Sequence, residues 1–176
     1  MNDILVVVDM QKDFIDGALG TPEAQAILPA VVEYARGFEG QVVFTRDTHT
    51  EDYMNTQEGS RLPVPHCVKG TPGWQLAPAL QAIADEDACP VFDKPTFGST
   101  ALAHWLAARH AETPITRVVL VGLCTDICVV SNTLLLKANF PEVSISVDAA
   151  CCAGVTPETH QAALVTMGMC QIEVKN

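Results

Sequence analysis

The stretch VVLVGLCTDIC, residues 118–128, constrains the fold of this chain more than any other. It begins as a continuous valine-rich run, which is typical of a strand buried on both faces of a parallel sheet. Gly122 ends that run, and Thr125 and Asp126 are residue types that favour the N-cap of a helix. The pattern predicts a buried strand followed at once by a helix, with Cys128 in the first helical turn.

The predicted place of Cys128 is one where a cysteine can be reactive. Backbone N–H groups are unpaired in the first turn of a helix and the helix dipole is positive there, so a thiolate would be stabilised. In open α/β sheets the ligand site lies at the carboxyl ends of the strands. A small buried hydrophobe is the alternative interpretation of this cysteine, and its position alone does not decide between the two.

Strand and helix patterns alternate along the rest of the chain. We expect further strands at 4–8, 41–46, 89–93, 143–147 and 170–174, and helices at 22–36, 74–84, 100–110 and 157–168. Residues 10–17 indicate an irregular loop, and 50–71 a long polar loop of a length that is usually functional. The alternation predicts an α/β fold: a single domain over residues 1–176, a three-layer αβα sandwich with a mainly parallel, roughly six-stranded sheet.

Composition and charge exclude several classes of function. The net charge of −11 argues against a nucleic-acid partner, because phosphate contacts need clustered lysine and arginine. No apolar run is long enough to span a bilayer, so we expect no membrane partner, and the amino terminus lacks the basic region of a signal peptide. The seven cysteines are odd in number and lack a short secreted context, so we expect free thiols in a reducing cytoplasm.

Three reactive side chains follow the ends of three predicted strands: Asp9, Lys94 and Cys128. Because the carboxyl ends of parallel strands share one edge of the sheet, we expect these side chains to converge. Cys128 would then be the nucleophile, Asp9 the general base that takes its proton, and Lys94 a cation that stabilises both. The backbone N–H groups of Cys124 and Cys128 are natural donors for an oxyanion hole. The alternative interpretation is that Asp9 and Lys94 form a structural ion pair.

These residues lie in three motifs: VDMQKDF at 8–14, KPTFGST at 94–100 and GLCTDIC at 122–128. In all three the chain resembles the isochorismatase-like cysteine hydrolases, and among these the nicotinamidase-type amidohydrolases. The resemblance implies an Asp9–Lys94–Cys128 triad that hydrolyses a small amide through a thioester acyl-enzyme. It also implies a cis peptide bond between Leu123 and Cys124, which would turn the Cys124 N–H into the oxyanion hole. The family's isochorismatases lack the nucleophilic cysteine, so Cys128 argues against that branch.

A second polar group follows the predicted second strand. Asp47 and His49 are two residues apart on an extended segment and point the same way, and His66 could close over them. The segment HCVKGTPG that begins at His66 resembles the metal-binding segment of nicotinamidases, which implies Asp47, His49 and His66 as ligands. The usual second histidine is replaced near Tyr53, and Glu58 is the best substitute. A carboxylate and two imidazoles suit a divalent metal, zinc first, with manganese or iron as alternatives.

Nicotinamide is the substrate that the resemblance favours, with Phe14 and Leu123 as expected substrate contacts. The tryptophan that often precedes the loop histidine in nicotinamidases is absent, since LPVP stands at residues 62–65. Phe14 remains as one stacking face for a pyridine ring. Trp74 is either a second wall of the pocket or a core or helix-surface residue. The sequence therefore predicts a small-molecule amide or carbamoyl substrate.

Three hypotheses for the function stay open on the sequence. The first is a metal-assisted, nicotinamidase-like amidohydrolase. The second is a metal-independent hydrolase of an N-carbamoyl or ureido compound, with the group of Asp47, His49 and His66 empty or structural. The third is a non-catalytic ligand-binding protein or thiol sensor on the same fold, against which Asp9 and Lys94 argue, since a sensor needs neither. By resemblance alone we also expect a homo-oligomer, a dimer or larger.

Overall fold

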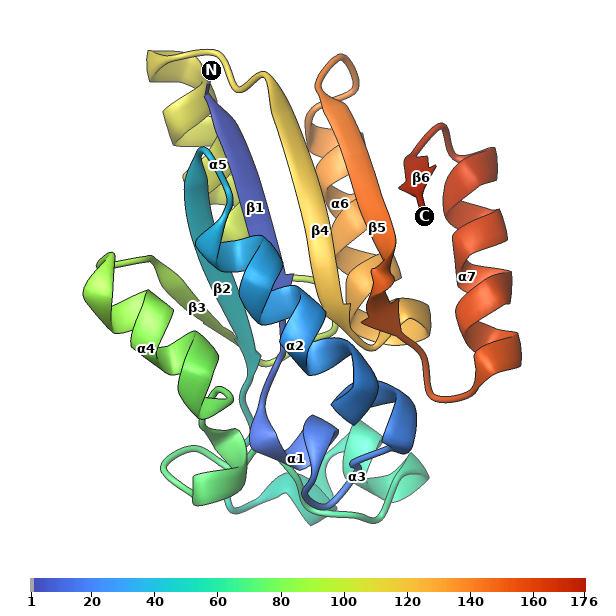
Figure 1. The fold of residues 1–176 in the computed structure, drawn as a ribbon. Coiled ribbons are helices and arrows are strands. Elements are labelled where there is room, and N and C mark those ends of the chain that lie inside the picture. Colours follow the sequence, from blue (N-terminus) through green and yellow to red (C-terminus); the bar gives the residue numbers. More distant parts are fainter. Residues whose placement is uncertain (1) are drawn as a thin grey trace.

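A six-stranded sheet forms the centre of the computed structural model, which describes residues 2–176 (Figure 1). All neighbouring strands run parallel, in the order β3-β2-β1-β4-β5-β6. The strands are β1 (Asp3–Val8), β2 (Gln41–Asp47), β3 (Val91–Lys94), β4 (Arg117–Leu123), β5 (Ser144–Ala153) and β6 (Glu173–Lys175). The predicted parallel six-stranded sheet is confirmed, and the valine-rich run of β4 lies at its centre beside β1.

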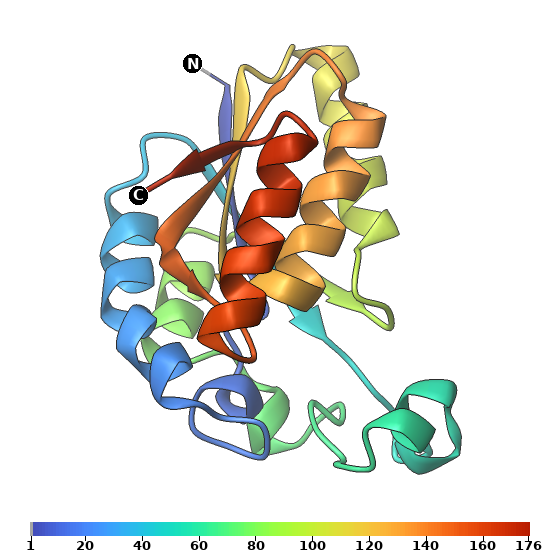
Figure 2. The ribbon, with the colours of Figure 1, turned by 90° about the vertical axis from the view of Figure 1, so that its right-hand side faces the viewer.

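Helices cover both faces of this sheet (Figures 1 and 2). One face packs against α2 (Pro22–Arg36) and α4 (Pro78–Glu86). The other face packs against α5 (Thr100–Glu112), α6 (Val130–Asn139) and α7 (Pro157–Met169). Two short helices, α1 (Lys12–Ile15) and α3 (Gln57–Arg61), lie in the connections that follow β1 and β2.

Strand β1 shows why the sequence of a central strand is a continuous run of apolar residues. Ile4, Val6 and Val8 belong to the core under α5, α6 and α7, whereas Leu5 and Val7 belong to the core under α2 and α4. All five side chains are completely buried. Burial of each contributes about 1.5–3 kcal/mol relative to exposure. Two apolar layers on one sheet make the three-layer sandwich, and that prediction is confirmed.

Several predicted boundaries are wrong by a few residues. The loop predicted at 10–17 contains α1, and α4 begins at Pro78 rather than Trp74 because proline occupies its first turn. The loop predicted at 50–71 contains α3. Strand β5 continues past Asp148 to Ala153, and β6 starts only at Glu173 because α7 runs to Met169.

The predicted helix start after β4 is also wrong in detail. Residues 125–129 form one turn of π-helix before α6, and no side chain caps it. The Thr125 hydroxyl instead lies 2.8 Å from Nδ1 of His160, and the Asp126 carboxylate accepts the Val155 N–H at 3.1 Å. Both residues therefore tie this turn to α7 and the loop before it. Cys128 lies inside the π-helical turn, a feature that is frequent at functional sites.

Gly122 is the residue of β4 at which only glycine fits. Its φ is +115°, and a Cβ there would overlap the carbonyl oxygen of Val8 on the neighbouring strand. The register between β4 and β5 shifts between Leu120 and Gly122. Since Val8 pairs with Gly122, the end of β1 at Asp9 lies next to the point where β4 ends.

Gly122→Ala is expected to lower the free energy of unfolding by about 2–4 kcal/mol, from the left-handed backbone and the overlap with Val8. Urea unfolding followed by circular dichroism measures the change. Gly168→Ala is the matched control, because nothing lies within 4 Å of a Cβ at Gly168 in α7. Alanine there should leave stability unchanged or raise it by up to about 1 kcal/mol. Equal effects of the two variants would contradict the close approach at Gly122.

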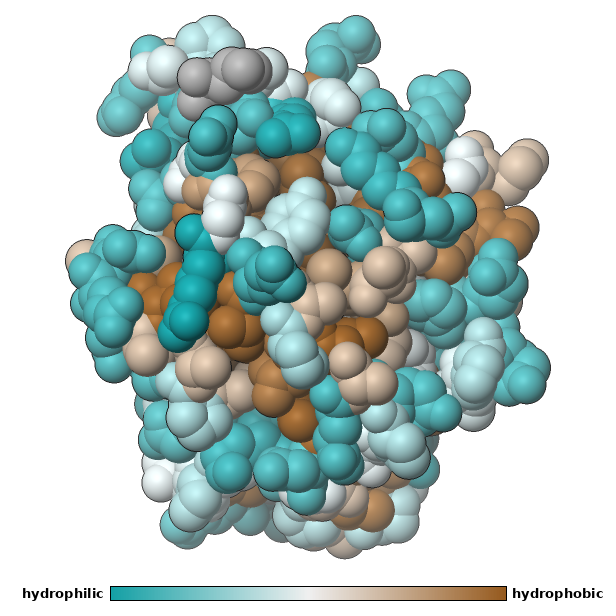
Figure 3. Space-filling view, in the orientation of Figure 1, coloured by the Kyte–Doolittle hydropathy of each residue, from teal (hydrophilic) through white to brown (hydrophobic). Residues whose placement is uncertain are grey.

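On the face in Figure 3, apolar side chains gather between α2 and α4, and hydrophilic residues surround them. Among residues 2–176, no helix combines the length and apolar character needed to cross a bilayer.

Candidate active site

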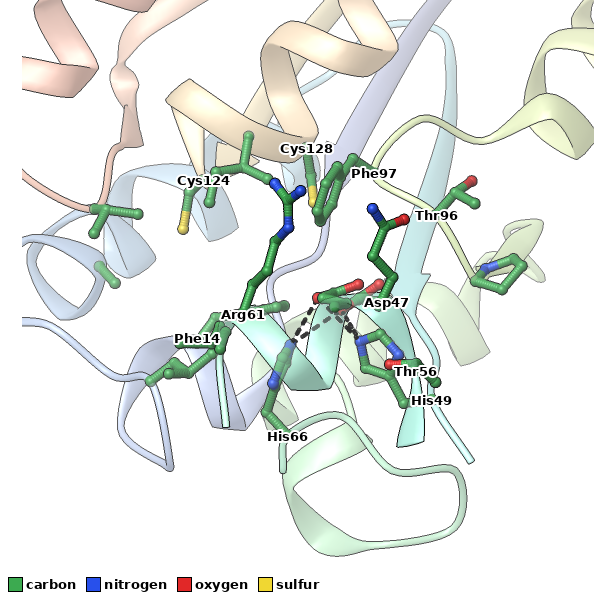
Figure 4. A pocket seen from close by; sticks show the side chains of 18 of the residues that line it. Phe14, Asp47, His49, Thr56, Arg61, His66, Thr96, Phe97, Cys124 and Cys128 are labelled. Carbon is green, nitrogen blue, oxygen red and sulfur yellow. Dashed lines mark hydrogen bonds and ion pairs between the residues drawn. The ribbon is translucent and has the colours of Figure 1, made fainter. Parts of the chain in front are cut away.

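A cavity of about 880 Å³ opens at the carboxyl ends of the central strands (Figure 4). We call it the strand-end pocket. Segments that leave β1, β2, β3 and β4 all contribute to its walls, as expected for an open parallel sheet. Its lining includes Phe14, Asp47, Phe97, Cys124 and Cys128.

Asp9, Lys94 and Cys128 converge below this pocket, and we call this group its floor; of the three, Cys128 lines the cavity itself. The Nζ atom of Lys94 lies 2.6 Å from Oδ2 of Asp9 and 3.4 Å from Sγ of Cys128. The Thr45 hydroxyl donates to the other oxygen of Asp9 at 2.6 Å. Exposed fractions are 0% for Asp9, 1% for Lys94 and 4% for Cys128, so these charges interact away from water. The structure therefore brings together the three side chains that the strand ends predict.

Burial controls the proton affinities of this group. Burial raises the pKa of Cys128 well above its usual value, the Asp9 carboxylate adds to this, and the Lys94 ammonium opposes it. Burial also raises the pKa of Asp9, again against Lys94. Burial lowers the pKa of Lys94, but the charges of Asp9, Cys128 and Asp47 outweigh it, so the net pKa is raised. Burial therefore opposes the thiolate that a place in the first turn of a helix would favour, and the Lys94 ammonium offsets part of this effect.

Cys124 lies at the turn between β4 and the π-helix and lines the pocket. The Leu123–Cys124 peptide bond is cis, as the resemblance implies. No hydrogen bond within residues 2–176 uses the backbone N–H of Cys124. Burial raises the pKa of the Cys124 thiol to about 12, and the nearby Asp126 carboxylate adds to this.

Asp47, His49, Glu58 and His66 form a second group on the adjoining wall, with one ligand atom from each within 4.8 Å of the others. Oδ2 of Asp47 lies 2.9 Å from Nε2 of His49 and 3.5 Å from Nε2 of His66. Oε1 of Glu58 lies 3.6 Å and 3.7 Å from the same two nitrogens. Two carboxylates and two imidazoles that face one point fit a divalent metal ion by donor type and number.

Neighbouring groups orient these side chains. Nδ1 of His66 donates to the Val64 carbonyl at 2.8 Å, which leaves Nε2 with its lone pair toward the group. The Tyr53 ring packs against both imidazoles, with centroids 4.7 Å from His49 and 5.1 Å from His66. Its hydroxyl donates to Leu62 rather than to the group. Glu58, the predicted substitute for the usual second histidine, therefore reaches the group, and Tyr53 packs against the two imidazoles.

Lys94 joins the two halves of the site. Its Nζ atom lies 3.4 Å from Oδ1 of Asp47, besides its contacts with Asp9 and Cys128. Burial raises the pKa of Asp47, but the neighbouring imidazoles of His49 and His66 and the charge of Lys94 outweigh it, so the net pKa is well below its usual value. One buried ammonium thus compensates the carboxylates of both groups.

Two residues that hold the site were missed by the sequence reasoning. Gln11 is completely buried; its amide donates to the carbonyls of Asp47 and Trp74 and accepts the Asp47 N–H. The Asp13 carboxylate accepts the Cys67 N–H at 2.8 Å, next to His66. Both residues lie in the motif VDMQKDF, so polar residues directly after a buried strand were the available signal.

Of the two expected substrate contacts, one lines the pocket and the other does not. Phe14 lines the pocket, with its ring centroid 5.5 Å from that of His66. Leu123 does not line the pocket, so that prediction is wrong. Its side chain is completely buried in the core under α2 and α4, because alternation in β4 turns it away from the pocket.

Trp74 is a core residue, and the Arg46 guanidinium lies over its ring, 3.8 Å from the centroid. Two lining residues that were not expected are Arg61 and Phe97.

Comparison with known proteins agrees with this geometry. The nicotinamidase/pyrazinamidase of Mycobacterium tuberculosis is 31% identical, over 97% of this chain and 96% of its own length. The crystal structure of nicotinamidase PncA from Bacillus subtilis matches with a TM-score of 0.84 at 28% identity, over 100% of both chains. The pyrazinamidase of Pyrococcus horikoshii in complex with zinc matches with a TM-score of 0.80 at 29% identity, over 99% of this chain and 98% of that one.

The family match spans nearly the whole chain. The model of the isochorismatase domain covers residues 3–174, from β1 to β6. The relatives named above, similar over almost their full length, are named as enzymes that act on the amides nicotinamide and pyrazinamide. The chain therefore belongs to the isochorismatase domain family.

Proposed function

We propose that this protein is a cysteine hydrolase of small amides, and that its leading substrate is nicotinamide, which it converts to nicotinate and ammonia. The observation that carries the proposal is the contact of Lys94 with both Asp9 and Cys128 in the strand-end pocket. A surface ion pair would be expected at a strand end if the function were structural, but this pair is completely buried beside a thiol. Sequence and fold similarity to nicotinamidases supports the choice of substrate.

The first half of the reaction uses Asp9 as the base. As Sγ of Cys128 attacks the amide carbon, its proton passes to the Asp9 carboxylate, because Lys94 contacts both the sulfur and this carboxylate. The new C–S bond displaces the carbonyl electrons onto oxygen. When these electrons return, the C–N bond breaks and the proton on Asp9 leaves with the nitrogen as ammonia. A thioester on Cys128 remains.

The second half restores the thiol. Water gives a proton to Asp9 and its oxygen attacks the thioester carbon, and the C–S bond then breaks. The sulfur regains the proton from Asp9, and the carboxylic acid product ionises on release. Lys94 keeps its proton throughout; its charge stabilises the sulfur and the carboxylate as negative charge moves between them.

The oxyanion of each tetrahedral intermediate needs donors. We assign this role to the backbone N–H groups of Cys124 and Cys128. The free N–H of Cys124, at the mouth of the turn that carries the nucleophile, supports the assignment. Each such donor contributes about 3–4 kcal/mol to the stabilisation of the transition state.

Asp47, His49, Glu58 and His66 are the residues that would hold a divalent metal ion, zinc first among the candidates. Bound there, the ion would orient the substrate through its ring nitrogen or through a water molecule. Phe14 lies beside His66 and offers an aromatic face to a planar ring. The residues on this wall thus position the substrate, and those on the floor carry out the chemistry.

Two other functions follow from the same residues. One is hydrolysis of an N-carbamoyl or ureido compound without a metal, for which the same floor would serve. The other is non-catalytic ligand binding or thiol sensing, a function that would not need a base and a cation around a buried thiol.

We also propose a cytoplasmic setting, supported by seven free cysteines. We further propose a homo-oligomer, a dimer or larger.

An ammonia-release assay with nicotinamide, pyrazinamide, N-carbamoylglycine and ureidoacrylate, with and without chelator, tests the proposal. We expect the wild-type protein to release ammonia from nicotinamide and to lose this activity when a chelator removes the metal. We also expect one divalent ion per chain in the wild-type protein and none in His49→Ala. His104→Ala, at an exposed position of α5, is the matched control and should keep both metal and activity. Metal-free activity on a carbamoyl compound alone would favour the second function, and no release from any amide would refute hydrolysis.

A further inference from the structure

Arg61 is a charged residue of the strand-end pocket for which the reaction above has no use. It is the last residue of α3 and lines the cavity together with Phe97 and Cys128. Figure 4 shows its side chain extending from α3 toward the side of the cavity where Phe97 and Cys128 lie. No ion pair within residues 2–176 includes its guanidinium. Its donors are therefore available to a ligand in the pocket.

The other charges of the site are matched. Lys94 lies 2.6 Å from Asp9. Asp47 and Glu58 belong to the metal group, where the charge of a divalent ion would offset theirs. Arg61 thus adds one unmatched positive charge to the pocket of a chain whose net charge is −11. A guanidinium without an ion-pair partner attracts ligands of the opposite sign.

We propose that Arg61 binds a carboxylate of the substrate, so that the pocket selects small amides that carry a carboxylate apart from the amide that is cleaved. The guanidinium fork matches a carboxylate with two parallel hydrogen bonds. The cavity of about 880 Å³ has room for a substituent beyond the amide.

This inference rests on amide hydrolysis at Cys128 and adds the class of substrate. The carboxylate takes no part in bond making: water adds to the amide carbon, ammonia leaves, and the product is a dicarboxylate. Nicotinamide remains a substrate of the same site, and Arg61 adds a preference for the carboxylated member of a pair of amides that are otherwise alike. The competing view is that Arg61 is merely solvated, as its exposed position at the end of α3 allows.

Matched substrate pairs separate the two views: 3-carbamoylbenzoate against benzamide, and succinamate against propanamide. Within each pair only a carboxylate is added, so the ratio of kcat/KM values measures its recognition. We expect the wild-type protein to prefer the carboxylated member, and Arg61→Gln to reduce that ratio by about 10- to 100-fold. Arg61→Lys should keep part of the preference, because it retains the charge but not the fork. Arg36→Gln, in the last turn of α2, is the control and should leave the ratio unchanged.

Binding to Cys128→Ala protein tests the same contact without turnover. Titration calorimetry with 3-carbamoylbenzoate should give a Kd that rises by about 10- to 100-fold when Arg61→Gln is added. If ammonia is released but neither the ratio nor the Kd depends on Arg61, the carboxylate subsite is wrong and hydrolysis stands. If Kd depends on Arg61 but no amide is hydrolysed, the subsite stands and the proposed reaction fails.

Discussion

Cys128→Ala is expected to reduce ammonia release from nicotinamide by about four orders of magnitude or more, because removal of a nucleophile abolishes the covalent route. Cys128→Ser should recover little: a hydroxyl gives up its proton far less readily than a thiol, and the pocket already disfavours an anion at this position by burial. The measurement is kcat/KM from a coupled ammonia assay, with urea unfolding to verify the fold.

The control for this change is Cys170→Ser, which alters an exposed cysteine at the end of α7 and should leave kcat/KM unchanged. Intact-protein mass spectrometry after rapid acid quench adds a direct observation. The wild-type protein should gain the mass of an acyl group, and Cys128→Ala should not. A Cys128→Ala protein with more than a tenth of the wild-type activity would contradict the covalent mechanism.

Lys94→Met is expected to abolish activity and to lower the free energy of unfolding by about 3–5 kcal/mol, because it leaves buried carboxylates without their cation. Both Asp9 and Asp47 depend on the same Nζ atom, at 2.6 Å and 3.4 Å. The second substitution Asp9→Asn should restore part of the lost stability but none of the activity, since it removes one unpaired charge together with the base.

Lys69→Met is the control for Lys94→Met. Lys69 pairs with Asp93 at 3.4 Å, but its side chain is 64% exposed, so loss of the pair should cost at most about 1 kcal/mol. Urea unfolding of metal-free protein measures the free energy of unfolding for the wild type, for Lys94→Met with and without Asp9→Asn, and for Lys69→Met. A Lys94→Met protein as stable as Lys69→Met would show that the carboxylates on the pocket floor do not depend on the ammonium.

The sequence was most informative where strands deliver side chains. Parallel strands share an edge, so Asp9, Lys94 and Cys128 could be predicted to converge from their positions alone, and the structure brings them together. The metal group could be anticipated only with the help of the family's motif, because Glu58 comes from α3, within a region predicted to be a loop.

Other features depend on contacts that a linear pattern does not contain. Leu123 is next to Cys124 in the sequence, but alternation along β4 decides the side of the sheet on which its side chain lies. The proton affinity of Cys128 depends on the balance of desolvation and neighbouring charge, which requires its depth in the protein. Arg61 lines the pocket because α3 folds back over the strand ends, and no local signal marks that return.

The central place of β1 has a consequence for how the protein reaches its working form. The segment after β1 contacts chain that is far away in sequence: Gln11 reaches Trp74, 63 residues on, and Asp13 reaches Cys67, 54 residues on. β1 itself pairs with β4, where Asp3 faces Arg117. Pairings between such distant segments form slowly, because a long loop must close first. No amino-terminal fragment that lacks β4 contains a complete site, so during synthesis catalytic competence arises only after most of the chain has left the ribosome.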